Sequence, residues 1–298
     1  MADGPDPVRL IRTGGRPDAA PGFDRIAIIG LGLMGGSLAL AARRAWPDAR
    51  VSGGDRHDVL EAAMRLHAVV AGADDPVVAA EADLLVLAAP VAENARLVGE
   101  LPALLAGNAI VTDLGSAKRV MVEAAIGMPE RLTFIGGHPL AGAPRSGIEF
   151  ARPDLFAGRP WILVPGTAPP DATLRLEAFV AGVGGVPRIM TAEQHDHLLA
   201  YLSHLPQLVV SALMQVIGEE LGEDGLALSG RGLQDATRMA SSPGSTWKDV
   251  YAANADEVAT ALETLCETLN RVRTRLDRGD VIAGLFESAN YWRKALPE

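Results

Sequence analysis

Short, unbroken apolar segments alternate with alanine-rich segments over the first two thirds of the chain. The apolar segments are four or five residues long, are rich in Ile, Val and Leu, and do not alternate with polar residues, which is typical of parallel strands buried on both faces. They predict strands over residues 25–29, 50–53, 84–88, 109–112, 133–136 and 161–164. The intervening segments, such as 37–46 and 117–126, have helix-forming compositions. This alternation predicts an α/β fold with a doubly wound sheet.

The pattern changes near residue 190, after which no strand is predicted. Residues 195–221 are broadly apolar and predict a long helix, with a kink at Pro206 because proline lacks the backbone N–H. Residues 256–277 predict a second long helix with one apolar stripe, spaced alternately by four and three. The stripe contains Val258, Leu262, Leu265, Leu269, Val272 and Leu276. It is buried either within one chain or against a second subunit, and we expect a homodimer because so small a helical domain needs additional packing surface.

Length and local composition predict two domains and an arm. Residues 1–22 are rich in Pro, Gly and charged residues, which predicts a flexible N-terminal arm. Residues 23–190 then form the sheet domain, and residues 191–298 form an all-helical domain for substrate binding and dimerisation. Two domains fit a chain of 298 residues at roughly 150 residues per domain.

Composition excludes several functional classes. The chain has 37 acidic and 27 basic residues, a net charge of −10, so general binding to nucleic acid or to an anionic membrane is not expected. The single cysteine, Cys266, excludes an internal disulfide framework and a thiolate zinc finger. No uninterrupted run of about 18 apolar residues predicts a transmembrane helix, and the N-terminus lacks the apolar core of a secretory leader. We therefore expect a soluble, cytoplasmic protein.

A glycine-rich loop follows the first predicted strand and precedes a predicted helix. Its residues are Gly30, Leu31, Gly32, Leu33, Met34 and Gly35. Gly30 permits a tight turn, Gly32 lets the backbone approach a pyrophosphate at the helix N-terminus, and Gly35 lets helix and strand pack closely. In this strand–turn–helix context the loop predicts a dinucleotide-binding Rossmann domain.

Two further segments bear on the cofactor. Asp55 follows the second strand, about 20 residues after the glycines, where a carboxylate binds the adenosine ribose hydroxyls and repels a 2′-phosphate. This favours NAD over NADP, although Arg56 beside it is a residue type that can receive a 2′-phosphate. Pro90 follows the third of these strands with Ala88 and Ala89, and the three predict a small apolar shelf for the cofactor.

Polar residues follow the next two predicted strands. Ser116 stands in TDLGSAK, where it is either an N-cap or part of a ligand site, and His138 stands in GGHPLAG. Carboxyl ends of parallel strands share one edge of the sheet, where ligands bind in open α/β folds. Histidine is the commonest general base near neutral pH, so His138 is the candidate base.

The motifs GLGLMGGS, TDLGSAK and GGHPLAG, in this order and spacing, resemble the TyrA-type prephenate and arogenate (cyclohexadienyl) dehydrogenases. The downstream segments LFAGRPWILVP, QHDH, YLSHLP and GLQDATRMA agree with that resemblance, which covers the chain from about Phe23 to near its end. It implies an N-terminal Rossmann domain and a C-terminal helical dimerisation domain. It also implies NAD-dependent oxidative decarboxylation of prephenate to 4-hydroxyphenylpyruvate in tyrosine biosynthesis.

The resemblance also implies residue roles. His138 takes the proton of the substrate's ring hydroxyl, Ser116 helps to position that hydroxyl and the histidine, and Arg238 holds the ring carboxylate. His204 faces the cleft from the helical domain. Gln207 stands where the family often has a second histidine, so it bears on recognition of the substrate's side chain.

Arg145 stands where the family commonly has an acidic residue, and a cation there favours a negatively charged substrate end. This substitution and Gln207 leave open whether prephenate, arogenate or an amino-substituted prephenate is the substrate. The cluster His195, Asp196 and His197 lacks the further ligand that a metal site needs, so we expect no metal.

Two other functions remain open on sequence alone. A β-hydroxyacid dehydrogenase or imine reductase shares the domain order but generally uses a lysine or aspartate from the helical domain, which here has only Lys248 and Lys294 as lysines. A non-catalytic nucleotide sensor needs only the glycine loop and leaves His138 and Ser116 without a role.

Overall fold

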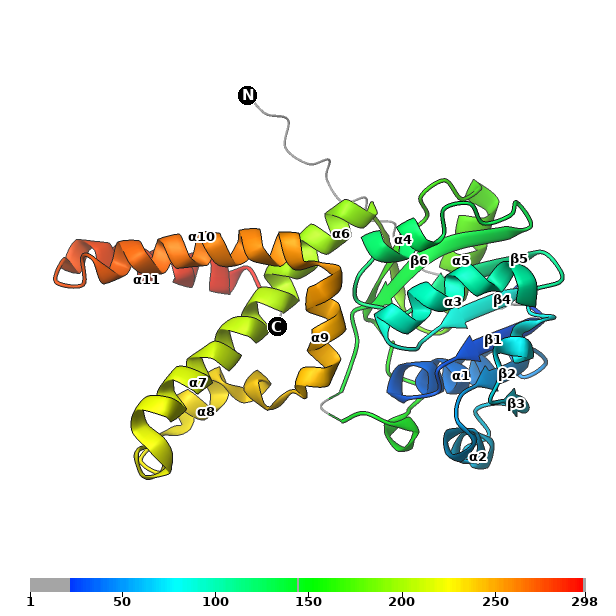
Figure 1. Cartoon of the computed structure of the whole chain (residues 1–298), viewed down its shortest axis with the longest axis horizontal. Coiled ribbons are helices and arrows are strands. Elements are labelled where there is room, and N and C mark those ends of the chain that lie inside the picture. Colours follow the sequence, from blue (N-terminus) through cyan, green and yellow to red (C-terminus); the bar gives the residue numbers. More distant parts are fainter. Residues whose placement is uncertain (1–21, 144, 297–298) are drawn as a thin grey trace. The chain divides into compact units, whose positions relative to one another are not determined.

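The computed structural model describes residues 22–143 and 145–296 and divides the chain into two compact units. The sheet unit contains the residues up to Leu199 and also Ser241–Asn254. The helical unit contains Ala200–Ala240 and the chain from Ala255 onward. The arm expected over residues 1–22 falls, apart from Gly22, outside the described residues. The predicted α/β fold followed by a helical part is confirmed (Figure 1).

Within the described residues, the sheet unit contains eight strands in the order β3-β2-β1-β4-β5-β6-β7-β8. The strands are β1 Arg25–Ile29, β2 Arg50–Gly54, β3 Ala71–Ala73, β4 Leu84–Leu87, β5 Ala109–Asp113, β6 Leu132–Pro139, β7 Pro160–Val164 and β8 Val186–Ile189. The helices of this unit are α1 Leu33–Ala45, α2 His57–Arg65, α3 Val91–Leu104, α4 Arg119–Ala124, α5 Pro170–Gly182, α6 Ala192–Leu199 and α9 Gly244–Ala253, with short 3₁₀ turns η1 Pro76–Ala79 and η2 Ile148–Phe150.

The strands from β3 to β6 are parallel, but β7 runs antiparallel to β6 and parallel to β8. The prediction that residues 161–164 form a parallel strand like the others was therefore wrong with respect to β6. The physical reason is the connection, because the described residues between β6 and β7 (140–143 and 145–159) contain only the short turn η2 and no crossover helix. Without a crossover, the chain returns along the neighbouring strand in the opposite direction.

Two apolar layers cover the two faces of the sheet. In β1, Ile26 and Ile28 pack in one cluster with α1, α2 and α5, while Ala27 and Ile29 pack in another with α3 and α4. Alternating side chains of one strand thus enter opposite layers, as a doubly wound sheet requires. All four side chains are buried, which explains why the sequence shows no polar alternation there.

The helical unit begins with a π-helical turn, η3 Ala200–His204, which leads directly into α7 Leu205–Leu226. Pro206 lies just after this turn and has no N–H to donate to it, which fits the π-helical geometry there, while the kink expected at Pro206 itself stays a prediction. The remaining elements are α8 Arg231–Ala236, the 3₁₀ turn η4 Arg238–Ser241, α10 Ala255–Arg273 and α11 Gly279–Lys294. Gly222, with φ of 62°, interrupts α7 near its end.

One helical run within the described residues, Ala192–Leu226, is long and apolar enough to cross a membrane by length and composition. Only 17% of its most apolar window is buried within the chain. Helices that pack in the core of a soluble protein meet the same criterion, so the finding is weak evidence for a membrane segment.

Candidate functional site

The glycine loop between β1 and α1 has the geometry of a close backbone approach. Gly30 has φ of +93°, and a Cβ on it would lie 2.6 Å from the carbonyl carbon of Ala88. A Cβ on Gly35 would lie 1.8 Å from the carbonyl oxygen of Gly30, so both positions require glycine. A Cβ on Gly32 would meet nothing within 4 Å. The open space at Gly32, at the N-terminus of α1, is the cradle that a pyrophosphate needs.

Asp55 holds this loop from the end of β2. One carboxylate oxygen accepts a hydrogen bond from the Leu31 amide at 2.6 Å, and the other accepts one from the Arg56 amide at 2.7 Å. The carboxylate thus lies beside the loop, where a ribose would follow a bound pyrophosphate.

A cavity of about 660 Å³, which we call the nucleotide pocket, opens at this edge. It is lined by Ile29, Gly30, Gly32, Gly54, Asp55, Arg56, Asp74, Asp75, Pro76, Ala88, Ala89, Pro90, Glu93, Arg96 and Leu97. Its two arginines already face carboxylates, since Arg96 pairs with Glu93 at 2.6 Å and Arg56 with Asp58 at 3.5 Å. Carboxylates outnumber cations in the lining, which is unfavourable for a 2′-phosphate.

A second cavity of about 580 Å³, the histidine pocket, shares Ala88, Ala89 and Pro90 with the first. Its full lining is Met34, Ala88, Ala89, Pro90, Val91, Leu114, Gly115, Ser116, His138, Pro139, Ala141, Ser245, Asp249 and Val250. Buried Asn94 fixes the shared segment, because its side-chain oxygen accepts from the Ala89 amide at 3.1 Å and its nitrogen donates to the Leu87 carbonyl at 3.3 Å.

The structure therefore brings together most of the cofactor and catalytic residues expected in the sheet unit. Gly30, Gly32, Asp55, Arg56 and Pro90 line the nucleotide pocket, and Pro90 also lines the histidine pocket. Met34, Ser116 and His138 line the histidine pocket as well. Leu33 and Gly35 line neither pocket: Leu33 packs against the core, and Gly35 allows α1 to approach the loop.

His138 is part of β6 itself, because this strand continues to Pro139, three residues beyond the predicted end at residue 136. A buried network holds the chain just before it. Asp113 accepts from the Gly137 amide at 3.1 Å and forms an ion pair with Lys118, which also donates to the Gly137 carbonyl at 2.8 Å. Burial lowers the pKa of Lys118, and the charge of Asp113 acts in the opposite direction.

Ser116 is not an N-cap, because Lys118 occupies the N-cap position of α4 and makes no side-chain cap. The cap comes from α6 instead. Asp196 accepts hydrogen bonds from the amides of Lys118 and Arg119 at 2.8 and 3.0 Å, and from the Arg119 side chain at 3.2 Å. Asn254 joins this site by donating to the Asp196 carbonyl at 2.8 Å and accepting from Arg119 at 2.9 Å.

His195 lies between Asp196 and the candidate base. Its Nε2 is 2.8 Å from Nδ1 of His138, and its Nδ1 is 2.7 Å from Oδ1 of Asp196. Both His195 and Asp196 are fully buried. Burial lowers the pKa of His195. Burial would raise the pKa of Asp196, but the hydrogen bonds from His195 and from the two α4 amides outweigh it and lower that pKa.

The remaining predicted residues belong to the helical unit. His204 ends the π-helical turn and is buried, and Gln207 lies one turn later on α7. Gln207 donates to the carbonyl of Met239 at 2.9 Å, which brings this part of α7 to the residue that follows Arg238. Arg238 begins η4 and is exposed.

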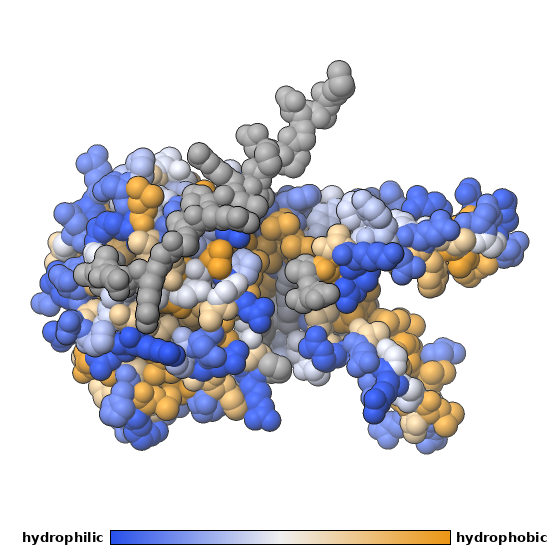
Figure 2. All heavy atoms as spheres, turned by 180° about the vertical axis from the view of Figure 1, so that it is seen from behind, coloured by the Kyte–Doolittle hydropathy of each residue, from blue (hydrophilic) through white to orange (hydrophobic). Residues whose placement is uncertain are grey.

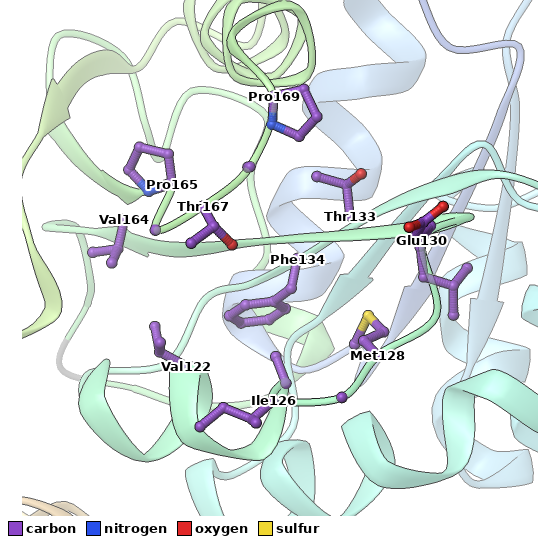
Figure 3. A pocket seen from close by; sticks show the side chains of 15 residues that line it. Val122, Ile126, Met128, Glu130, Thr133, Phe134, Val164, Pro165, Thr167 and Pro169 are labelled. Atoms are coloured by element: carbon purple, nitrogen blue, oxygen red, sulfur yellow. The ribbon is translucent and has the colours of Figure 1, made fainter.

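A third cavity, of about 720 Å³, lies between the end of α4, the start of β6 and the segment after β7 (Figure 3). Apolar side chains such as Val122, Ile126 and Phe134 dominate it, and none of the predicted site residues lines it. Among the described residues, no group of three or more His, Cys, Asp or Glu side chains has the arrangement of a metal site.

Sequence reasoning missed several residues at the site. Ser245 and Asp249 reach the histidine pocket from α9, and Asp74 and Asp75 reach the nucleotide pocket. Nothing in the sequence placed α9 with the sheet, because it lies more than 100 residues after His138. The contact from His195 to His138 had a sequence signal, the adjacent His and Asp, but from the sequence we considered these residues only as a metal cluster.

Two family models match the chain. Residues 38–188 match the nucleotide-binding domain of prephenate dehydrogenase, and residues 191–288 match its dimerization domain. A prephenate dehydrogenase of Bacillus subtilis is 31% identical over 92% of this chain and 76% of its own length. A cyclohexadienyl dehydrogenase of Zymomonas mobilis is 30% identical over 92% of this chain and 96% of its own.

Solved structures agree with the sequence comparisons. The crystal structure of prephenate dehydrogenase from A. aeolicus in complex with hydroxyphenyl propionate and NAD⁺ matches with a TM-score of 0.84. That chain is 27% identical, and the match covers 92% of this chain and 98% of the other. With the glycine loop, the histidine pocket and both domain models in agreement, the chain belongs to the prephenate dehydrogenase family.

Proposed function

We propose that the protein is an NAD-dependent prephenate dehydrogenase that forms 4-hydroxyphenylpyruvate. The observation that carries this proposal is the histidine pocket, where His138 and Ser116 lie beside the segment Ala88–Pro90 that also lines the nucleotide pocket. A base next to a dinucleotide site at the carboxyl edge of the sheet suits removal of a hydroxyl proton during oxidation.

The residues of the two pockets have distinct roles in this proposal. Gly32 and the N-terminus of α1 hold the pyrophosphate, and Asp55 accepts hydrogen bonds from the ribose. Bound NAD supplies the hydride acceptor. The carboxylates of the nucleotide pocket disfavour NADP, and both of its arginines are already paired with acidic residues.

His138 moves one proton in each turnover. In its neutral form it accepts the proton of the ring hydroxyl while the carbon bearing that hydroxyl gives up a hydride. Loss of the ring carboxylate as carbon dioxide leaves its bonding electrons in the ring, which becomes aromatic with a phenolate oxygen. The proton then returns from His138 to that oxygen, so the enzyme ends in its starting state. Ser116 positions the hydroxyl.

Recognition of the substrate's two carboxylates is assigned to the helical unit. Arg238 binds the ring carboxylate, for which its planar fork is suited, and His204 faces the substrate. Gln207 bears on the side chain, which is a keto acid in prephenate and an amino acid in arogenate. Because Gln207 is neutral, and because one relative is named a cyclohexadienyl dehydrogenase, arogenate is the second candidate substrate.

We also propose a cytoplasmic homodimer. Residues 191–288 match a dimerization domain, and the helical unit exposes many large apolar side chains within one chain (Figure 2). They include Leu213, Val216, Leu221, Leu269, Leu276, Phe286, Tyr291 and Trp292. A second copy of the chain is the partner that would cover them.

Initial rates at 340 nm with prephenate and arogenate, each with NAD and NADP, test the function. We expect NAD reduction with prephenate, and a His138→Asn variant with kcat lowered by about 100-fold or more and an unchanged affinity for NAD. Activity with arogenate alone would move the substrate assignment to the second candidate. No turnover of either substrate, or near-normal turnover by His138→Asn, would contradict the proposal.

A further inference from the structure

We propose that His195 and Asp196 are positioning residues that hold His138 in the tautomer of a base and stabilise the charge it gains. This inference rests on the proposed function only for the identity of the base. It concerns the chain of contacts from Nδ1 of His138 to His195 at 2.8 Å and from His195 to Asp196 at 2.7 Å.

The contacts determine which nitrogen carries each proton. Asp196 is ionised and only accepts, because two backbone amides and the Arg119 side chain all donate to its carboxylate. Nδ1 of His195 must therefore be protonated. Since burial favours neutral His195, its Nε2 is an acceptor, and Nδ1 of His138 must donate to it. Neutral His138 then has its lone pair on Nε2, the nitrogen that a base needs.

The same chain of hydrogen bonds, from His138 through His195 to Asp196, stabilises the protonated state of His138. When His138 takes the substrate proton, its positive charge lies two hydrogen bonds from the Asp196 carboxylate, through a fully buried histidine. Low local dielectric makes such a charge-assisted chain stronger than it would be in water. The charged or titratable groups that border the chain of contacts and the histidine pocket are Asp113, Lys118, Arg119, Glu193 and Asp249.

An alternative role for Asp196 is purely structural, because it caps α4. The two roles predict different behaviour. If Asp196 only caps α4, its loss affects folding but not the pH dependence of turnover. If it acts on His138 through His195, which we call the relay, its loss changes the protonation of His138. Substitutions that retain part of the hydrogen bonding separate them. Asp196→Asn keeps a side-chain oxygen for the amides and removes the charge, and His195→Gln keeps both an acceptor and a donor that His195→Leu removes.

We expect His195→Leu to lower kcat by about 100-fold with little change in KM for NAD, and His195→Gln to recover at least about 10-fold of that loss. Asp196→Asn should move the acid limb of the kcat/KM profile to lower pH, because His138 no longer has the carboxylate behind it. The control is His197→Gln. His197 is an exposed histidine on the same helix, and its replacement should leave kcat and the acid limb of the kcat/KM profile unchanged.

A readout independent of turnover is the tautomer itself. In ¹⁵N-histidine NMR spectra of the full-length protein at pH 8, with His138 assigned through the His138→Asn variant, we expect a proton on Nδ1 of His138. In His195→Leu we expect the His138 signals to show a mixture of the two tautomers, because Nδ1 no longer has His195 as its acceptor. Circular dichroism and NAD titration show whether each variant folds. If Asp196→Asn does not fold, the comparison of His195→Leu with His195→Gln tests the proposal.

Three results would overturn the proposal: a proton on Nε2 of wild-type His138, an unmoved acid limb in folded Asp196→Asn, or His195→Leu with turnover within about threefold of wild type. If wild-type protein turns over neither prephenate nor arogenate, the proposed function fails, while the NMR measurement still tests the relay.

Discussion

At the scale of single residues, the site depends on backbone atoms as much as on side chains. Gly137 precedes the candidate base, and its amide and carbonyl are both bound, by Asp113 and Lys118 respectively. A Cβ on Gly137 would lie 2.4 Å from the Asp113 carbonyl oxygen and 2.8 Å from Oγ1 of Thr112. The nearer neighbour is backbone in the middle of the sheet and cannot rotate away.

We therefore predict that Gly137→Ala destabilises the protein by about 1–3 kcal/mol, because overpacking forces β5 and β6 apart. It should also lower kcat, since His138 is the next residue. Urea unfolding and initial rates measure the two effects. Gly107→Ala is the control, because a Cβ there meets nothing within 4 Å. Equal stability of Gly137→Ala and wild type would show that β6 can shift without cost.

The predicted residues of the two pockets could be named from the sequence because they lie at the ends of strands or just after them. Gly30, Asp55, Ser116 and His138 each come just after, or at the end of, a buried apolar run, and parallel strands bring such positions to one edge. His195 and Asp249 could not be placed in this way. Their position depends on how α6 packs against α4 and how α9 packs against α3, and the sequence of a helix does not show which neighbour it will meet.

At the scale of elements, α5 contains a charge that the fold buries. Glu177 lies on α5 and is only 9% exposed, and this burial raises its pKa. A carboxylate with a raised pKa costs folding free energy while it is ionised. That cost is complete above the folded pKa, and it disappears as the pH falls below the unfolded value of about 4.3, where both states are protonated.

Glu177→Gln should thus raise the urea midpoint at pH 7.5, and the difference from wild type should narrow as the pH falls towards 5. The exposed Glu81, replaced by Gln, is the matched control and should give no such pH-dependent gain. A gain that stays constant over this pH range would mean that the charge of Glu177 is not its source.

Element types were predictable where local pattern decides them. The central strands β1, β4 and β5 are apolar runs whose burial matches the pattern. The short edge strands β3 and β8 were not predicted. β3 has only three residues, Ala-Gly-Ala, and β8 contains Pro187 and Arg188, so neither shows the apolar run of a buried strand. The direction of β7 could not be predicted from the local pattern either, because a strand's direction depends on the segment that connects it to the preceding strand, here the one between β6 and β7.

At the scale of the whole molecule, the apolar stripe of α10 is only partly covered within one chain. Val258 is buried near the start of the helix, but Leu269 is 55% exposed and Leu276, just beyond the helix, is 65% exposed. Exposed apolar area that grows along a regular stripe is typical of a surface that another subunit covers.

We predict that Leu269→Glu converts the proposed dimer to a monomer, or shifts it strongly in that direction, because a carboxylate would be buried in the interface. Sedimentation velocity at several concentrations measures this. Leu174→Glu is the control, since Leu174 is 64% exposed on α5 of the sheet unit and should leave the assembly unchanged. A dimer that survives Leu269→Glu would place the interface on other helices.

The return of residues 241–254 to the sheet unit has a consequence for how the protein is made. During synthesis the strands emerge first, but Asn254, which bonds to Asp196 and Arg119, is translated about 55 residues after Leu199, where the first part of the sheet unit ends. The ribosome must release the whole 200–240 segment before the first unit can close. A gene fusion or recombination event that exchanged the two halves at a single crossover would therefore separate the sheet from its own last helix.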